Sequence, residues 1–252
     1  MLKSKYIKHA ALASLLIFGT AAYAAADSST IGLEGFYDNY REPEEGTHVN
    51  NHAIYGSLTG TYVHNMTPDY FWAADGRGSY GSDHYHSASG TDTNVPQMEG
   101  EIRLRTGINA AFAGGELMPY IGLGTRLYYD DFSNKPGGYT RAIEQIYAPV
   151  GVTYKYITGG LLLAPTVEYD PLIYGHVYSG LKPYIGTDIN NHQHSGYGLR
   201  SEFMVGQDNN GYGWQVGPFI RYWNINNSTV NDGYYEPKNN RVQAGVALRL
   251  DY

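Results

Sequence analysis

The sequence has no cysteine, more acidic than basic residues, and no long apolar run beyond its N-terminal segment. The absence of cysteine excludes disulfides, thiol chemistry and cysteine-ligated metal sites. With 24 acidic against 17 basic residues and a formal net charge of −7, the chain lacks the basic surface that nucleic-acid binding requires. After the N-terminal segment, no stretch approaches the ~20 apolar residues that a membrane helix needs.

The first 26 residues have the three parts of a secretory signal peptide. Three lysines within the first eight residues precede an apolar run at 10–18, and small residues with Ala-x-Ala spacing fill 19–26. We predict export through the Sec pathway and cleavage before Asp27, with cleavage before Ala25 as an alternative. An uncleaved anchor is the competing interpretation. The domain organisation is then a signal peptide at 1–26 and one domain at 27–252, whose net charge becomes −10 without the three lysines (−7 − 3).

The end of the chain carries the clearest structural pattern. From Arg241 to Tyr252 every second residue belongs to an apolar set that ends on an aromatic residue. A period of two indicates a strand whose two faces contact different solvents. The chain is also rich in tyrosine (26) and glycine (32). An exported chain with alternating strands and no membrane helix has the profile of a transmembrane β-barrel, and a secreted β-sandwich is the competing fold.

Ten segments alternate in this way, and the connections between them alternate in length. The short connections carry the Pro, Gly, Asn and Asp signals of tight turns. Short turns on one side and long loops on the other are typical of outer-membrane barrels. We therefore predict an all-β fold, a transmembrane antiparallel β-barrel of ten strands (eight or twelve as alternatives), with both termini on the periplasmic side. The strands fall at 31–38, 54–62, 70–77, 99–108, 121–130, 145–156, 161–170, 199–205, 214–222 and 241–252, the short turns at 66–69, 113–118, 158–160 and 208–211, and the long extracellular loops at 42–51, 82–97, 131–141, 171–195 and 226–239.

Three motifs resemble those of small Gram-negative outer-membrane β-barrels of the porin-like and OmpX/OmpW-like kind. The segment Pro119-Tyr-Ile-Gly-Leu-Gly is similar to a strand opening in those barrels, and Gly217-Pro-Phe-Ile-Arg-Tyr-Trp-Asn-Ile with Glu236-Pro-Lys-Asn resembles an uncharacterised group of them. The resemblance implies location in the cell outer membrane, contact with outer-membrane lipid and lipopolysaccharide, and assembly by the barrel-assembly machinery. It also implies an assembly signal in Val246, Leu248, Leu250 and Tyr252.

Charged residues occupy the strand face opposite the apolar one. A charge on the lipid side would cost roughly 2–4 kcal/mol at mid-depth, so these residues are expected to point inward. Because barrels near eight strands are filled by side chains, we predict a lumen packed with ion pairs, with a narrow polar pore as the alternative. The predicted network consists of Asp75, Arg77, Glu99, Glu101, Arg103, Arg105, Arg126, Asp130, Lys155, Glu168, Asp170, Arg200, Glu202, Arg221 and Arg249.

Histidines gather in or beside the predicted external loops. Two pairs have His-x-His spacing, which places both rings on one side of an extended strand. Imidazole is the commonest transition-metal ligand, so convergence of the two pairs would create a metal site. The alternative is that these histidines bind no metal and occur, with asparagine and serine, as ordinary residues of polar loops. The candidate ligands are His84, His86, His192 and His194.

A rim hydrolase is the remaining alternative. Omptin-like proteases use acidic residues and an Asp-His pair at the outer rim, although no local motif here matches theirs. Acylhydrolase barrels need serine and histidine on the lipid face, where Ser201 has the required phase and no histidine clearly joins it. We predict no cofactor and a structural or surface-interaction role, with a passive pore and a rim hydrolase as alternatives. The rim candidates are Asp83, His84, Asp130, Asp131 and Asp170.

Overall fold

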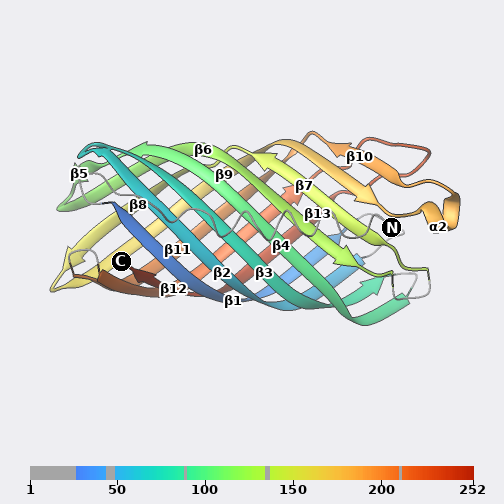
Figure 1. The fold of residues 1–252 in the computed structure, drawn as a ribbon, viewed down its shortest axis with the longest axis horizontal. Helices are drawn as coiled ribbons and strands as arrows, with labels where there is room; N and C mark the ends of the chain where they lie inside the picture. The colour runs from blue at the N-terminus through green and yellow to red at the C-terminus, as the bar shows by residue number, and fades with distance from the viewer. Residues whose placement is uncertain (1–26, 44–48, 88–89, 134–136, 210–211) are drawn as a thin grey trace.

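The computed structural model describes residues 27–252 apart from 44–48, 88–89, 134–136 and 210–211, so the predicted signal peptide lies outside the described residues. The chain forms one antiparallel sheet of thirteen strand segments (Figure 1). No helix among the described residues is long and apolar enough to cross a membrane. The elements are β1 (Ser28–Glu42), β2 (Val49–Thr67), β3 (Tyr70–Ser87), β4 (Gly90–Ile108), β5 (Ala110–Phe112), β6 (Gly115–Asp131), β7 (Thr140–Tyr147), β8 (Val150–Thr158), β9 (Leu161–Ser179), α2 (Lys182–Ile185), β10 (Ile189–Gln193), β11 (Gly196–Asn209), β12 (Tyr212–Ile225) and β13 (Asn239–Asp251).

The sheet closes into a barrel with ten strand positions around its circumference, here called staves. β1 pairs with β13 from Thr30↔Asp251 to Arg41↔Asn240, which joins the two ends of the sheet. Three staves consist of two segments each: β4 with β5, β7 with β8, and β10 with β11. Closure pairs the backbone groups that an open edge would leave free. The predicted ten-stranded antiparallel barrel is confirmed, and a sandwich is excluded.

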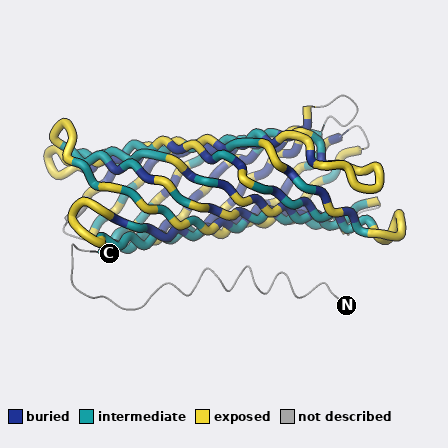
Figure 2. Tube along the Cα trace, turned by 90° about the horizontal axis from the view of Figure 1, so that it is seen from above, coloured by how far each residue is buried: buried dark blue, intermediate teal, exposed yellow. Residues whose placement is uncertain are grey.

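The outer wall of the barrel is apolar. Large aliphatic side chains point outward and are exposed, as at Ile54 (77%), Leu33 (60%) and Ile121 (60%), whereas Glu34 and Asp170 are buried. Figure 2 shows the resulting alternation of exposed and buried residues along the strands. This inside-out distribution is what a barrel in lipid requires. The predicted assembly-signal residues belong to the same exposed outer face: Val246, Leu248, Leu250 and Tyr252.

The two ends of the barrel differ. At one end, here called the turn end, hairpins close within two residues, as at Gly159-Gly160, where both φ angles are positive. Such a turn needs glycine and matches the twist of the flanking strands. The start of β1 and the last residue of the chain meet there, because Ser29 N donates to Tyr252 O (3.1 Å) and Tyr252 N to Ser29 O (2.9 Å). The opposite end, here called the loop end, carries α2 and the longer connections (Figure 1).

Three boundary predictions were wrong. The segment 82–97 is mostly strand rather than loop, because β3 continues to Ser87 and β4 begins at Gly90. The segment 171–195 is also mostly strand, because β9 continues to Ser179 and β10 occupies Ile189–Gln193. Beyond the apolar band the outward residues are mostly polar, so the apolar alternation in the sequence fades while backbone pairing continues. The strand predicted at 145–156 is also interrupted between β7 and β8. There Ala148 N donates to Pro171 O (3.1 Å), and Pro149 has no N–H to continue the ladder.

Candidate functional site

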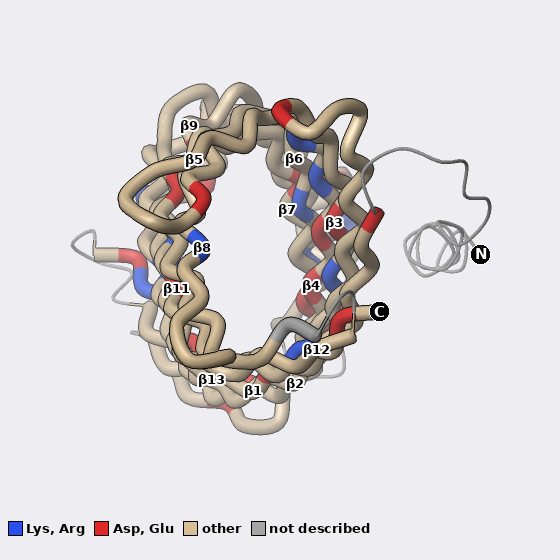
Figure 3. The backbone as a smooth tube through the Cα atoms, turned by 90° about the vertical axis from the view of Figure 1, so that its left-hand side faces the viewer, with Lys and Arg blue, Asp and Glu red and all other residues tan. Residues whose placement is uncertain are grey.

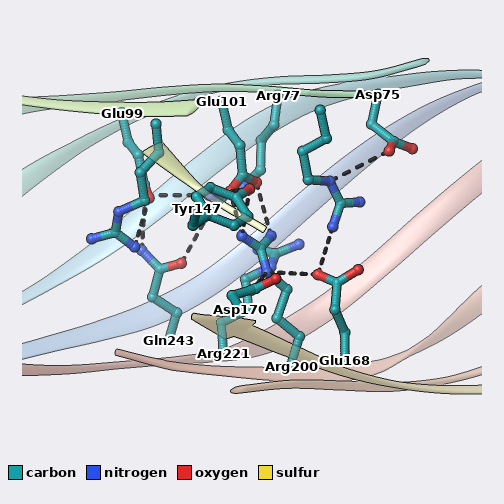
Figure 4. Close-up of polar contacts among 12 residues, drawn as sticks. Asp75, Arg77, Glu99, Glu101, Tyr147, Glu168, Asp170, Arg200, Arg221 and Gln243 are labelled. Atoms are coloured by element: carbon teal, nitrogen blue, oxygen red, sulfur yellow. Dashed lines mark hydrogen bonds and ion pairs between the residues drawn. The ribbon is translucent and has the colours of Figure 1, made fainter. Parts of the chain in front are cut away.

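The inward faces of the staves bring opposite charges together across the lumen. Figure 3 shows charged residues recurring along the staves around the barrel, and Figure 4 shows side chains from different walls meeting in the middle. We call these residues the central network. Its members are Glu34, Asp75, Arg77, Glu99, Glu101, Arg103, Arg105, Glu168, Asp170, Arg200 and Arg221.

Arg200 joins residues from several strands of the central network; we call such a group of contacts across the lumen a tie. From β11 it donates two hydrogen bonds to Glu101 on β4, four staves away, and one to Asp170 Oδ2 (2.6 Å). Tyr147 donates its hydroxyl to the same Glu101 carboxylate (2.6 Å). Because Glu101 and Arg200 reach each other from distant staves, their side chains occupy the width of the lumen. Bidentate arginine–carboxylate contacts of this kind are also among the strongest in proteins.

A second set of contacts joins β12, β1, β3 and β4. Arg221 donates to both oxygens of Glu34 (2.6 and 3.0 Å), and Arg77 donates to Glu34 Oε2 (3.0 Å) while lying 3.3 Å from Glu99. Arg103 donates to Glu168 from β4 to β9 (2.8 Å). Each buried charge in these ties therefore has a partner, which offsets the cost of removing it from water.

Aromatic side chains complete the filling of the lumen. Trp223 and Tyr147 are fully buried, with ring centroids 5.2 Å apart. The guanidinium of Arg126 lies 4.2 Å from the Trp223 ring centre and 3.9 Å from Glu99, so it is held mainly by the ring. These inward aromatics were absent from the predicted lumen. Trp223 is two residues from the inward Arg221 on β12, so the period of two along a strand predicts that Trp223 also points inward.

Five residues assigned to the network by sequence lie outside the central network: Arg126 on the Trp223 ring, Asp130 with Arg141, and Lys155, Glu202 and Arg249 on the turn side. Lys155 makes no ion pair with another described residue and lines a cavity of about 270 Å³ on the turn side of the network. Arg249 pairs with Glu202 (2.6 Å) on the wall of the same cavity. The prediction that Lys155 belongs to the ion-pair network was therefore wrong, because its place on β8, on the turn side, puts it beyond the reach of the central carboxylates.

A separate cluster lies at the loop end, beyond the apolar band. Arg141 on β7 donates to Asp130 Oδ2 (3.0 and 3.1 Å) and Glu236 Oε1 (2.9 Å), and lies 3.6 Å from Glu42. Tyr40 OH is within donor distance of both Glu42 (2.9 Å) and Glu236 (3.1 Å). We call these five residues the latch cluster. It contains three carboxylates and one guanidinium, and sequence analysis missed it, apart from Asp130, because Glu236 comes from a loop without periodicity.

The latch cluster anchors the 226–238 segment, which joins β12 to β13. Glu236 is buried, and its backbone N–H donates to Ser228 Oγ (2.7 Å) within the same segment. The inward amide of Asn191 donates to the carbonyls of Thr229 (2.8 Å) and Tyr234 (3.0 Å). The segment is thus tied to β10 by hydrogen bonds and to the latch cluster through one carboxylate.

Ionisation of Glu42 should control the stability of this anchor. Burial, and then the nearby Glu236 carboxylate, raise the pKa of Glu42 from 4.5 to about 7. The folded protein then holds a proton that the unfolded chain releases. Its contribution to stability is fully present below about pH 4.5 and is lost as pH rises towards 7. Glu42→Gln should remove this dependence and raise the free energy of unfolding near ~pH 8 by roughly 1–3 kcal/mol.

The measurement is urea unfolding of the bilayer-inserted protein across this pH range. Glu144→Gln is the matched control, because Glu144 is exposed on the outer side of β7. The control should leave the pH dependence unchanged. An unchanged pH slope in Glu42→Gln would refute the role assigned to this carboxyl.

The histidines form two groups on different walls. His84 on β3 stacks on His52 of β2 (ring centroids 5.3 Å apart, 7° between planes). His192 on β10 lies near His176 (5.6 Å) and His194 (6.4 Å), four or five staves away. The described residues contain no group of three or more His, Cys, Asp or Glu able to hold a metal ion. The structure therefore does not bring His84, His86, His192 and His194 together, since strand pairing fixes them on different walls.

The rim-hydrolase candidates are also separated. Asp83 is buried on the inner face while the adjacent His84 points outward, because neighbouring strand residues face opposite sides. Asp130 is bound by Arg141 and Asp170 by Arg200. Ser201 is exposed on the outer face, whereas Asp131 follows Asp130 on the opposite side of β6. No described pair of these residues has the contact that an Asp-His or Ser-His mechanism uses.

Comparisons with known proteins identify the fold and nothing finer. No protein family and no curated protein matches the chain. Among solved structures, the outer membrane protease OmpT from Escherichia coli is similar with a TM-score of 0.53 and 12% identity, over 92% of this chain and 99% of that one. The translocator domain of the autotransporter NalP from Neisseria meningitidis gives 0.44 and 11%, over 95% and 92%. A major outer membrane protein from Thermus thermophilus gives 0.36 and 12%, over 90% and 100%. The chain has the fold of outer-membrane β-barrel proteins.

Proposed function

We propose that this chain is an outer-membrane protein with a closed lumen that acts through contacts at the cell surface. The turn end faces the periplasm and the loop end faces outward. The apolar outer wall supports membrane insertion, and aromatic side chains such as Tyr70, Trp214 and Tyr252 near the turn end fit a girdle at the headgroup level. Lipid and lipopolysaccharide are its surroundings, and the barrel-assembly machinery is its partner during biogenesis.

The cross-lumen ties are the observation that carries this proposal. Glu101 and Arg200 meet from staves four apart, and Tyr147 and Trp223 fill the space beside them. A passage for solutes would need these charges to separate, which leaves each one buried without its partner. The geometry therefore favours a plugged barrel over an open channel, in line with side-chain filling in barrels of similar size.

The loop end offers a surface for contact. Tyr184 and Ile185 of α2 are 52% and 39% exposed, and Val230, Tyr234 and Tyr235 of the 226–238 segment are 67%, 43% and 44% exposed. The hydroxyl of Tyr184 donates to Gly138 O (2.8 Å), so this ring is held in place. Exposed apolar and aromatic residues outside the membrane are typical of interaction sites, and tyrosine is enriched in them.

Single-channel recording of the refolded barrel in planar bilayers tests the closed lumen. We expect no steady conductance, because the central network separates the turn-side cavity of about 270 Å³ from the loop end. That cavity favours the alternative of a passive pore. A large, steady conductance of the unmodified protein would support the pore and overturn the proposal.

The surface role has its own test. Cells that display the barrel should attach to polystyrene and to glycan arrays, and the variant Tyr184→Ser/Val230→Ser/Tyr234→Ser should attach less. Ile146→Ser on the outer wall is the control, since that residue lies on β7 among the lipid-facing side chains. Equal attachment by all three proteins would remove the role assigned to the loops. A screen with peptide and lipid-ester substrates would detect a hydrolase.

A further inference from the structure

The outer wall of β1, β2 and β3 carries a compact group of basic and amide side chains just beyond the apolar band. Strand pairing aligns Asn39, His52 and His84 in one row, and Arg41, Asn50 and His86 in the next row. All six belong to the outward-facing set of their strands. We call these six residues the basic patch.

Arg41, in the basic patch, differs from the other arginines of the chain in where its side chain lies. The other arginines contribute to the lumen or the latch cluster, whereas Arg41 is exposed on the outside and makes no ion pair with another described residue. Neither row contains a carboxylate. The next position of outward phase after Arg41 is Pro43, which is exposed and carries no charge. An outward arginine among three imidazoles therefore gives this wall a local positive character on an otherwise acidic protein.

Side-chain contacts order the basic patch. The parallel rings of His52 and His84 lie 5.3 Å apart, and Tyr37 packs on His52 from the apolar side (6.4 Å). The Asn39 amide donates to Asn50 Oδ1 (2.8 Å), and the ring of His86 hydrogen-bonds Thr91 (3.0 Å). An imidazole N–H beside the Arg41 guanidinium can donate a hydrogen bond to an anion that the arginine attracts. Stacked histidines beside an arginine thus suit an anionic group with several oxygens.

The position of the basic patch relative to the apolar band indicates which anion it can meet. Tyr37 and Ile54, directly opposite each other, are the last outward apolar residues before Asn39 and His52 on the same strands. Ile54 and Tyr62, at the two ends of the apolar part of β2, are eight residue steps apart, which at ~3.3 Å per step and ~40° tilt is roughly 20 Å of membrane depth. The basic patch therefore lies where the headgroups of the outer leaflet begin.

We propose that the basic patch binds the phosphorylated headgroup of lipopolysaccharide in the outer leaflet, with Arg41 and the three histidines contacting phosphate oxygens. This inference rests on the outer-membrane location proposed above. The lipid-facing contact fixes one wall of the barrel to its surrounding lipid. The second histidine group, on β9 and β10, has a different character, because His176 lies opposite the exposed Glu144.

The test is native mass spectrometry of the full barrel released from nanodiscs that contain diphosphoryl lipid A. We expect Arg41→Gln/His52→Asn/His84→Asn/His86→Asn to retain roughly tenfold less of this lipid than the unmodified protein. The matched control is His176→Asn/His192→Asn/His194→Asn, which alters three histidines on the other wall and should retain lipid A normally. Arg41→Gln alone, expected to show a partial loss, keeps the test valid if the fourfold variant does not fold.

The lipid itself supplies the second arm. Lipid A from which both phosphates have been removed should bind the unmodified protein as weakly as diphosphoryl lipid A binds the fourfold variant. Equal retention of both lipids, or equal loss in the control variant, would overturn the proposal. Conductance and cell attachment do not enter this measurement, so a failure here is distinguishable from failure of the proposed surface role.

Discussion

Arg200→Ala should lower the free energy of unfolding by about 3–5 kcal/mol, because it leaves two buried carboxylates without their main partner. Glu101 and Asp170 each accept hydrogen bonds from this guanidinium, and both are buried. The measurement is equilibrium urea unfolding in lipid bilayers, followed by the heat-dependent shift of the band in detergent gels. The same variant should admit ions, since the contact between β11 and β4 across the lumen is gone.

Arg249→Ala is the matched control for this effect. Its pair with Glu202 has a similar 2.6 Å contact, but the two side chains remain 24% and 22% exposed, on the wall of the turn-side cavity. Water then replaces the lost partner, and the expected loss is about 1 kcal/mol or less. Equal destabilisation by Arg200→Ala and Arg249→Ala would show that the central tie is not special, and the closed-lumen proposal would lose its main support.

The fold was predictable because lipid imposes a simple rule on each strand. In β13, Leu248 and Leu250 face outward while Arg241 and Gln243 face inward, as the period of two indicates. The rule stops working beyond the apolar band, where the outward residues of β3 and β4 are mostly polar, so the sequence there resembles a loop. Backbone pairing continues there without any apolar residue to mark it.

The pairing of charges was not predictable from alternation. Alternation states that Glu101 and Arg200 point inward, but their contact depends on strand stagger and on the width of a ten-stave barrel. The latch cluster depends in addition on Glu236, which a loop of irregular backbone carries inward. The two histidine pairs also show that sequence does not give side-chain contacts. Their shared chemistry and their predicted loops suggested that they meet, but the strand order places β3 and β10 on different sides of the barrel.

Charge is distributed unevenly along the barrel axis. Near mid-depth, the ties described above match carboxylates with guanidinium groups, as for Glu34 with Arg77 and Arg221. At the loop end, the latch cluster has three carboxylates for one arginine. A balanced centre suits the low dielectric of the membrane, where unpaired charge is most costly. The acidic end can be tolerated because it lies beyond the apolar band, where a proton on Glu42 reduces the excess.

Leu248→Arg should reduce the free energy of folding into bilayers by about 2–4 kcal/mol, because it places a charge at mid-depth on the lipid face. Leu248 is 45% exposed on the outer wall and is paired directly with Leu33 on one side and Val216 on the other. Both neighbours are outward aliphatic residues, so the new guanidinium finds no carboxylate and no water nearby. Reversible urea titration in liposomes measures the change.

Asn224→Arg is the control that separates membrane depth from the chemistry of the substitution. Asn224 lies on the same outer face, two residues beyond Tyr222 on β12 and opposite Asn240, outside the apolar band. An arginine there stays in the headgroup region or in water, and the expected cost is about 0–1 kcal/mol. If both variants cost the same amount, the outer wall does not lie in a bilayer in the orientation proposed here. A mid-depth cost that appears in liposomes and falls in detergent micelles, where the new charge can reach water, would establish that lipid rather than the sheet itself sets the penalty.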